Sequence, residues 1–228
     1  MPALKFERQS GGTRDTMAFA PTSLIVAGWT GTDEAGLRHH IEELAAIGVP
    51  GPSTVPVFYR NAVSNVTQTT ELEVLGPDTS GEVEPVIVAM ADGLWLTVGS
   101  DHTDRKVETI GIALSKQLCA KVIGTTAWRL DDVADRWDSL IVRSYATIDG
   151  SRVLYQEGPL KGLRHPRDLV ARYGGGEPLG EGTVMLGGTM PAIGGIRPAT
   201  RFEMELEDPA TGNRITHAYD IEVLPVIS

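Results

Sequence analysis

Two glutamates stand two positions apart in the segment GEVEPVIV, at Glu82 and Glu84. Because side chains two apart in a β-strand point to the same face, both carboxylates can converge on one point. Two carboxylates held together repel each other unless a positive group lies between them, so the pair is half of a candidate cation site. From spacing alone, a strand end exposed to solvent is the simpler interpretation. A second pair, Glu71 and Glu73, shows how common the pattern is.

A third carboxylate, Asp101, directly follows the apolar segment LWLTVGS. The segments 82–88 and 94–98 predict a β-hairpin, which would bring Asp101 close to the Glu82 end of the partner strand. Three oxygen ligands would then meet at one end of a sheet. Oxygen ligands without cysteine or several histidines suit Mg²⁺, Mn²⁺ or Ca²⁺ better than zinc. Taken by itself, Asp101 is more simply interpreted as a turn residue.

Histidine and glutamate occur together in the segment HHIEE, residues 39–43. On a helix, both His40–Glu43 and His39–Glu43 share a face, because residues three and four apart are neighbours. A carboxylate that fixes the tautomer of a histidine makes it a competent general base for water. A surface pair beside an apolar stripe explains the same spacing, and the spacing does not decide between His39 and His40.

Short strands bounded by Gly, Pro and Asp turns are expected to position these residues. Beyond the hairpin, we expect strands within residues 23–29, 55–74, 140–155 and 183–226. Helices are expected at residues 32–48, 107–118, 131–139 and 165–173. Strands outnumber helices and the two do not alternate, so a parallel α/β sheet is not expected. The prediction is a β-rich α+β fold.

Composition narrows the class of protein. The chain has 228 residues, 41% of them hydrophobic, which suffices for one well-buried domain. Its net charge of −10, with no basic run, argues against nucleic acids and anionic membranes as partners. No stretch approaches the ~20 apolar residues that cross a bilayer, and the first residues lack the apolar core of a secretory signal. The single cysteine, Cys119, suits a reducing compartment, so the cytoplasm is predicted.

Taken in order, several segments resemble motifs of the fumarylacetoacetate hydrolase family. GEVEPVIV is similar to the family's E-x-E strand, VGSDHTDRKVE to its G-N-D-x-S/T-x-R-D segment, and SKQL to its K-S-F-D element. LGEGTVMLGGTMPAIGGIRPATRFEMELE resembles L-x-x-G-D-V-I/L-x-T-G-T-P-x-G-V/I-G and the strand after it, and HHIEEL resembles the H-x-x-E-M helix of acylpyruvase-like members. The match spans roughly Ser23 to Val226, and the chain resembles a divergent branch generally left as a domain of unknown function.

This resemblance implies a mixed β-sandwich roll with a few short helices. Residues 1–75 would form a small N-terminal cap region packed on a catalytic core of residues 76–228. It further implies a divalent ion, usually Mg²⁺, bound by Glu82, Glu84 and Asp101, and a homodimer.

The resemblance also implies roles around the substrate. Arg105 and Lys116 would add positive charge where an enolate or oxyanion develops. Thr189 would face the substrate, and His40 with Glu43 would activate water. All five are therefore candidate site residues.

Three positions depart from the family pattern. Glu108 stands where relatives often have glutamine, Arg60 replaces a strand lysine, and Ser100 replaces the asparagine before the aspartate. We predict that Arg60 and Glu108 contact the substrate together with Thr189. These departures leave the metal ligands intact and affect the choice of substrate.

Family members cleave, decarboxylate, hydrate or isomerise oxo acids, so the resemblance implies an enzyme with a small-molecule oxo acid as partner. The first expectation is a hydrolase that cleaves a C–C bond in a 2-oxo or 1,3-dicarbonyl acid, similar to an acylpyruvate or fumarylacetoacetate. One alternative is an oxaloacetate-type decarboxylase or tautomerase on the same fold. The other is a catalytically silent protein that binds a carboxylate ligand.

Overall fold

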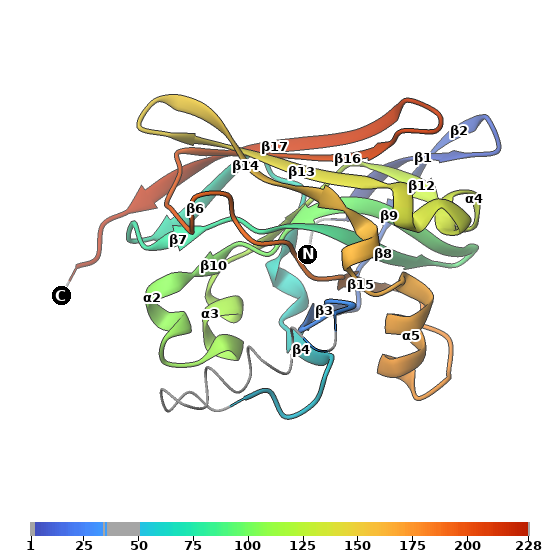
Figure 1. Ribbon diagram of the computed structural model, residues 1–228, viewed down its shortest axis with the longest axis horizontal. Helices are drawn as coiled ribbons and strands as arrows, with labels where there is room; N and C mark the ends of the chain where they lie inside the picture. The colour runs from blue at the N-terminus through green and yellow to red at the C-terminus, as the bar shows by residue number, and fades with distance from the viewer. Residues whose placement is uncertain (1–2, 34, 36–50, 228) are drawn as a thin grey trace.

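The computed structural model describes residues 3–33, 35 and 51–227, which contain a ten-stranded, a five-stranded and a short two-stranded β-sheet (Figure 1). The strands up to the hairpin are β1 Leu4–Ser10, β2 Thr13–Phe19, β3 Ser23–Gly28, β4 Val57–Asn61, β5 Val66–Thr67, β6 Glu71–Leu75, β7 Thr79–Ser80, β8 Val83–Met90 and β9 Gly93–Ser100. Those that follow are β10 Thr103–Asp104, β11 Lys121–Ile123, β12 Thr126–Arg129, β13 Ile141–Ile148, β14 Ser151–Pro159, β15 Thr183–Leu186, β16 Arg201–Asp208 and β17 Asn213–Leu224. The prediction of a β-rich fold is confirmed.

The larger sheet runs β2-β1-β12-β9-β8-β15-β3-β4, with β11 and β5 attached beside β9. Its central hairpin, β8–β9, is the one that the sequence predicts, with Val83 opposite Ser100 and Glu84 opposite Gly99. All eight residues of β8 are buried, because both faces of the strand are covered. Val86 packs into one core cluster, and Ile87 packs in another beside helix α5, Pro166–Gly174. The rigid hairpin thus fixes where its two ends lie.

The smaller sheet, β14-β13-β16-β17-β6, lies over the larger one and encloses a core between them (Figure 1). Burial alternates strictly along β16, as expected for a strand with one solvated face. Phe202 and Tyr219 point inward with Tyr155 and are almost fully buried. Two stacked layers with few short helices match the predicted sandwich-like roll.

The first 75 residues do not form a layer of their own. β3 pairs in parallel with β15 in the larger sheet, and β6 pairs in parallel with β17 in the smaller one. β1 likewise pairs with β12. The division that we expected between a cap, residues 1–75, and a core, residues 76–228, therefore has no counterpart in the sheets, because early strands hydrogen-bond to late ones.

Helices and 3-10 turns occupy the connections. They are η1 Val63–Asn65, α2 Arg105–Glu108, α3 Ile112–Leu118, α4 Leu130–Val133, η2 Ala134–Ser139, η3 Leu160–Gly162 and α5 Pro166–Gly174. The helix expected at 107–118 is two helices, and the one expected at 131–139 continues as a 3-10 turn. α5 is confirmed and ends at Gly175, whose φ of 63° suits a left-handed cap. The helix expected at 32–48 lies largely outside the described residues. No helix in the described part is long and apolar enough to cross a membrane.

Candidate metal centre

Glu82, Glu84 and Asp101 converge at the end of the β8–β9 hairpin, as their spacing predicts. One carboxylate oxygen from each lies within 4.8 Å of the others. We call these three residues the carboxylate centre. The Glu82 carbonyl accepts the Asp101 N–H at 3.0 Å, so the backbone itself holds the two ends of the hairpin together. Glu82 directly precedes β8 and Glu84 lies within it, whereas Asp101 directly follows β9.

Glu84 is only 2% exposed, and its Oε2 accepts the N–H of Gly188 at 2.7 Å. Burial, followed by the nearby charge of Asp101, raises the pKa of Glu84 well above its usual value. Gly188 has a φ of +95°, and a Cβ there would lie 1.8 Å from Thr30 Oγ1. Only glycine fits at this position, which explains one glycine of the sequence LGGTMP.

Asp101 is fully buried between two lysines. Lys116 Nζ of α3 contacts its Oδ2, and Lys121 Nζ of β11 contacts its Oδ1 at 2.9 Å. Burial by itself would raise the pKa of Asp101, but the two ammonium groups outweigh it and lower the pKa to about 2. Lys116 is buried as well, and the surrounding carboxylates raise its pKa despite that burial. Asp101 therefore stays ionised, and Lys116 stays charged.

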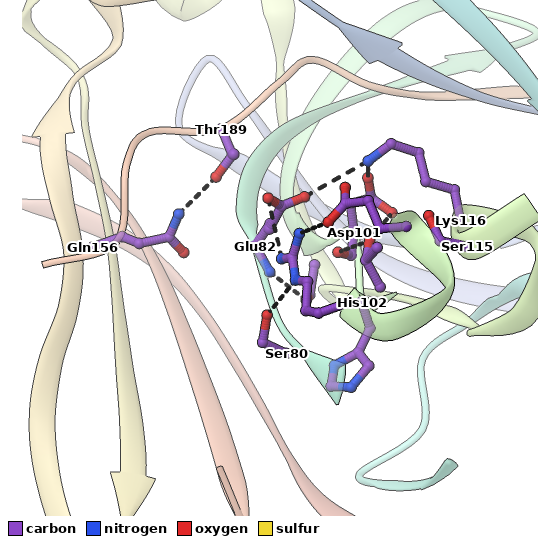
Figure 2. Close-up of polar contacts among 12 residues, drawn as sticks. Ser80, Glu82, Asp101, His102, Ser115, Lys116, Gln156 and Thr189 are labelled. Atoms are coloured by element: carbon purple, nitrogen blue, oxygen red, sulfur yellow. Dashed lines mark hydrogen bonds and ion pairs between the residues drawn. The ribbon is translucent and has the colours of Figure 1, made fainter. Parts of the chain in front are cut away.

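Glu82 is held by cations from two helices. Arg105 Nη2 of α2 lies 3.1 Å from Glu82 Oε1, and Lys116 Nζ lies 3.7 Å from Oε2. Arg105 also donates to Ser80 Oγ at 2.7 Å and to Glu108 Oε2 at 3.0 Å. Burial works against its charge, but Glu82 and Glu108 outweigh it and raise the pKa of Arg105. Figure 2 shows Lys116 reaching toward Glu82 and Asp101 from α3.

Thr189 and Gln156 approach from the other side (Figure 2). Thr189 Oγ1 donates to the Val83 carbonyl at 2.7 Å and accepts from Gln156 Nε2 at 2.8 Å. Gln156 Oε1 accepts the Val83 N–H at 2.9 Å. Both residues thus fix the β8 end that carries Glu82 and Glu84, and both also line the cavity above the centre.

A buried polar chain supports Asp101 from behind. His102 lies between Thr79 and Tyr219, with 2.9 Å contacts at each ring nitrogen, and Tyr219 donates to Ser100 Oγ at 2.8 Å. Burial, with Lys121 and Arg105 adding to it, lowers the pKa of His102 to about 3, so the ring is neutral. Ser100, one departure from the family pattern, is part of this support and does not enter the cavity lining.

The cavity above the centre has a volume of about 870 Å³. Its charged lining includes Glu82, Glu84, Arg105, Glu108 and Lys116. Glu108 lies at the cavity and is paired with Arg105, and its contact with substrate stays a prediction.

Arg60 is a correction to the sequence prediction. Its Nη1 donates to the carbonyls of Leu24 and Asn61 at 3.1 and 3.0 Å, and the residue is exposed and absent from the described lining. Its neighbour Tyr59 lines the cavity instead, because successive side chains of β4 alternate between faces. His40 and Glu43 lie outside the described residues.

Sequence reasoning missed Lys121, Gln156 and Gly188. Lys121 sits in the apolar segment CAKVIG, where a lone lysine in a buried strand signals a buried ionic partner. Gln156 lies within strand β14, far along the chain from Glu82 and Glu84, and no local pattern in the sequence marks it as a site residue. Gly188 is one of two adjacent glycines, and the sequence does not indicate which one needs a left-handed φ.

The sequence of this chain matches one known protein family model. A family model described as "Protein of unknown function (DUF2848)" matches residues 27–219. The chain belongs to the DUF2848 family. No curated protein sequence matches it.

Three solved structures illustrate which proteins have a similar fold. A protein named Cg1458 is 15% identical, with a TM-score of 0.65 over 94% of this chain and 83% of its own. A 2-keto-3-deoxy-D-arabinonate dehydratase, complexed with magnesium and 2,5-dioxopentanoate, is 14% identical, with a TM-score of 0.64 over 93% and 78%. A yeast protein of the fumarylacetoacetate hydrolase family is 16% identical, with a TM-score of 0.61 over 91% and 96%. This DUF2848 chain therefore has the fumarylacetoacetate hydrolase fold, which confirms the resemblance.

Proposed function

We propose that the carboxylate centre binds a divalent cation, Mg²⁺ first and Mn²⁺ or Ca²⁺ as substitutes. The donor set supports this, since three carboxylates without sulfur or imidazole suit these ions. The raised pKa of Glu84 supports it as well, because the described cations leave that carboxyl group insufficiently compensated. A bound cation would supply Lewis acidity for a substrate carbonyl.

The cations around the centre favour an anionic substrate. Arg105 and Lys116 line the cavity beside Glu82, and both are charged; Lys116 is buried and Arg105 is partly buried. With a divalent ion in place, positive charge would prevail there and attract a carboxylate. Arg105 can hold a carboxylate through its planar fork, whereas Lys116 can stabilise charge on an adjacent oxygen.

The reaction that we propose is hydrolysis of a C–C bond in a 2-oxo or 1,3-dicarbonyl acid. Water loses a proton to His40, oriented by Glu43, and adds to the acyl carbonyl. The C–C bond then breaks, and its electron pair passes to the neighbouring 2-oxo group as an enolate. Protonation of that enolate carbon yields a carboxylic acid and a 2-oxo acid. The magnesium complex of the dehydratase of similar fold supports a metal-dependent reaction of the lyase or hydrolase kind.

A decarboxylase or tautomerase of oxaloacetate-like acids is the second candidate. Lys116 and Arg105, both at the cavity, provide charge stabilisation for an enolate, and that reaction needs no activated water. Replacing His40 by Ala separates the two candidates. Under the hydrolase proposal, turnover falls by at least ~100-fold while Mg²⁺ binding persists; unchanged turnover eliminates His40 as the base.

The first experiment measures melting temperatures of metal-stripped protein with Mg²⁺ or Mn²⁺, with and without oxalate. We expect a metal-dependent rise that oxalate increases and that Glu84→Gln abolishes. Glu73→Gln is the matched control, because Glu71 and Glu73 repeat the spacing of Glu82 and Glu84 on the exposed face of β6. A rise with metal that is equal in both variants contradicts the metal centre. A rise with oxalate but no product from any oxo acid favours the silent binding protein.

A further inference from the structure

The cavity combines a charged floor with an apolar wall. Its floor consists of the charged residues Glu82, Glu84, Arg105, Glu108 and Lys116. Its described lining also contains large apolar side chains. Those that we call the apolar wall are Trp29, Tyr59, Ile112, Met190 and Ile196. A cavity of about 870 Å³ is far larger than the carbonyl and carboxylate of an oxo acid require. Most of the lining surface is therefore available to a part of the substrate other than its reacting group.

Ile196 indicates that this part of the substrate is apolar. The residue is 56% exposed, although a branched apolar side chain loses free energy by standing in water. Its loop is nevertheless anchored: the Ile193 N–H donates to the Tyr155 carbonyl at 2.7 Å, and the Arg197 N–H donates to the Tyr155 hydroxyl at 3.0 Å. The isoleucine is thus held at the cavity edge by the backbone on both sides.

Trp29, directly after β3, gives a second and independent indication that the cavity binds an apolar group. Its φ of 57° lies in the left-handed region, which a bulky side chain adopts only where the surroundings impose it. Such strain concentrates at binding sites. The Tyr59 ring beside it is half-buried, and that burial raises the pKa of the phenol, which therefore stays neutral. Two aromatic groups without charge thus line the cavity, Trp29 directly after β3 and Tyr59 within β4.

Charged groups beyond the floor are confined to exposed positions. In the described lining they are Glu157 and Lys161, and both residues are exposed. Glu157 is already paired with Arg143 Nε at 2.5 Å. In the described lining, Lys161 is the cation beyond the floor that a second carboxylate at the far end of a substrate could contact. The same carboxylate placed against the apolar wall would be strongly disfavoured.

We infer that the site selects oxo acids whose end remote from the 2-oxo acid group is apolar and about the size of an aromatic ring. This inference rests on the proposed function for the charged floor and adds the substrate class. Small acyl groups leave the apolar wall exposed, and dicarboxylates place a charge against it. Ile196 is a specificity-determining residue in this arrangement.

The test compares binding of pyruvate, phenylpyruvate and oxaloacetate to the Mg²⁺-loaded protein by calorimetry. We expect phenylpyruvate to bind at least ~10-fold more tightly than the other two, since a methylene in an apolar pocket already accounts for about that factor. Equal affinities, or preference for oxaloacetate, overturn the inference. Lys161→Ala is measured too: if it weakens oxaloacetate and leaves phenylpyruvate unchanged while oxaloacetate binds best, the rim lysine determines selection instead.

Ile193 provides a matched control, because it is 48% exposed in the same loop but absent from the cavity lining. Ile196→Asp should weaken phenylpyruvate at least ~10-fold and change pyruvate by less than ~3-fold, whereas Ile193→Asp should change neither. Because both positions are exposed, we expect both variants to fold. Equal losses in the two variants contradict the inference.

Failure of the substrate-class inference can be told apart from failure of the proposed function. The oxalate-dependent rise in melting temperature reports on the floor alone and should persist in Ile196→Asp. If that rise is absent from the wild-type protein, the proposed function fails. If it is present and phenylpyruvate shows no advantage, the apolar wall does not select the substrate.

Discussion

Two regions of the molecule carry the same sequence pattern with opposite surroundings. The carboxylate centre contains the pair Glu82 and Glu84, and strand β16 contains Glu203, Glu205 and Glu207 at the same alternate spacing. In the first region Glu84 is 2% exposed and hydrogen-bonded to a backbone amide. In the second, each glutamate remains accessible to water and meets an arginine.

The arginines of that second region belong to the outer face of the smaller sheet. Arg143 contacts Glu205 at 2.9 Å and also Glu207, while Arg152 contacts Glu203 at 3.0 Å. These cross-strand ion pairs lie at a surface, where each contributes little to stability. We call these residues the outer ladder. The comparison shows that alternate carboxylates indicate a strand face, whereas burial and the choice of partner make a site.

The largest expected effect comes from Asp101→Ala. This change leaves Lys116 and Lys121 without their shared carboxylate in a buried place, so we expect a loss of about 3–5 kcal/mol in the free energy of unfolding. Urea denaturation of the metal-stripped protein measures it. The outer ladder provides the contrast: Glu203→Ala should cost no more than about 1 kcal/mol. Similar losses at both sites would erase the distinction between the regions.

Gly188→Ala should follow, with a loss of about 1–3 kcal/mol. The new Cβ would collide with Thr30 Oγ1 and would sit at a φ unfavourable for alanine. Thermal unfolding measures the loss, and Mg²⁺ titration reports whether Glu84 is displaced. Combining it with Thr30→Ala should restore part of the stability, because one of the two causes is removed. No recovery would assign the whole loss to backbone conformation.

The effect of Glu84→Gln on the melting temperature should have opposite signs without and with metal. Without metal, a neutral side chain avoids the cost of the buried charge and its repulsion by Asp101, so we expect a melting temperature higher by roughly 2–4 °C. With Mg²⁺ at 100 times its Kd, the wild-type protein gains about 2.7 kcal/mol that the variant lacks, and the order reverses. An unchanged order would mean that Glu84 is not a ligand.

The smallest effect is expected at Glu207 in the outer ladder. The hydrogen bond from Arg143 lowers the pKa of Glu207 below its usual value of 4.5, with burial acting weakly in the opposite direction. A carboxyl group with a lowered pKa stabilises the fold at neutral pH, and that contribution disappears as the pH falls through the folded-state pKa. Glu207→Gln should therefore be less stable than wild type at pH 7 and equal to it in acid. A difference independent of pH would contradict this pairing.

Sequence reasoning succeeded where geometry is local. The i, i+2 spacing of Glu82 and Glu84 and the pairing of a short hairpin bring the three carboxylates together. Spacing alone favoured a solvent-exposed strand end, and the family resemblance led us to expect a metal site there instead. It failed for Arg60, since the face that a residue presents on β4 depends on how β4 pairs with β3. Lys121 and Gln156 reach the site through long-range contacts that no local pattern encodes.

The cap and core that we expected on either side of residue 75 are joined by strand pairing, which the sequence does not reveal for the same reason. Strand pairing joins segments more than a hundred positions apart, and the sequence near residue 75 contains a turn that reads like a linker. Composition cannot reveal that the strands on either side belong to two different sheets.

That pairing also constrains how the molecule is made. β3 acquires its parallel neighbour only when β15 has been synthesised, and β6 only when β17 has. Until then, an emerging chain presents unpaired backbone along these strands, and closing such long loops is slow. Folding should therefore be mainly post-translational, and chains lacking β17 should aggregate rather than fold to a smaller active form.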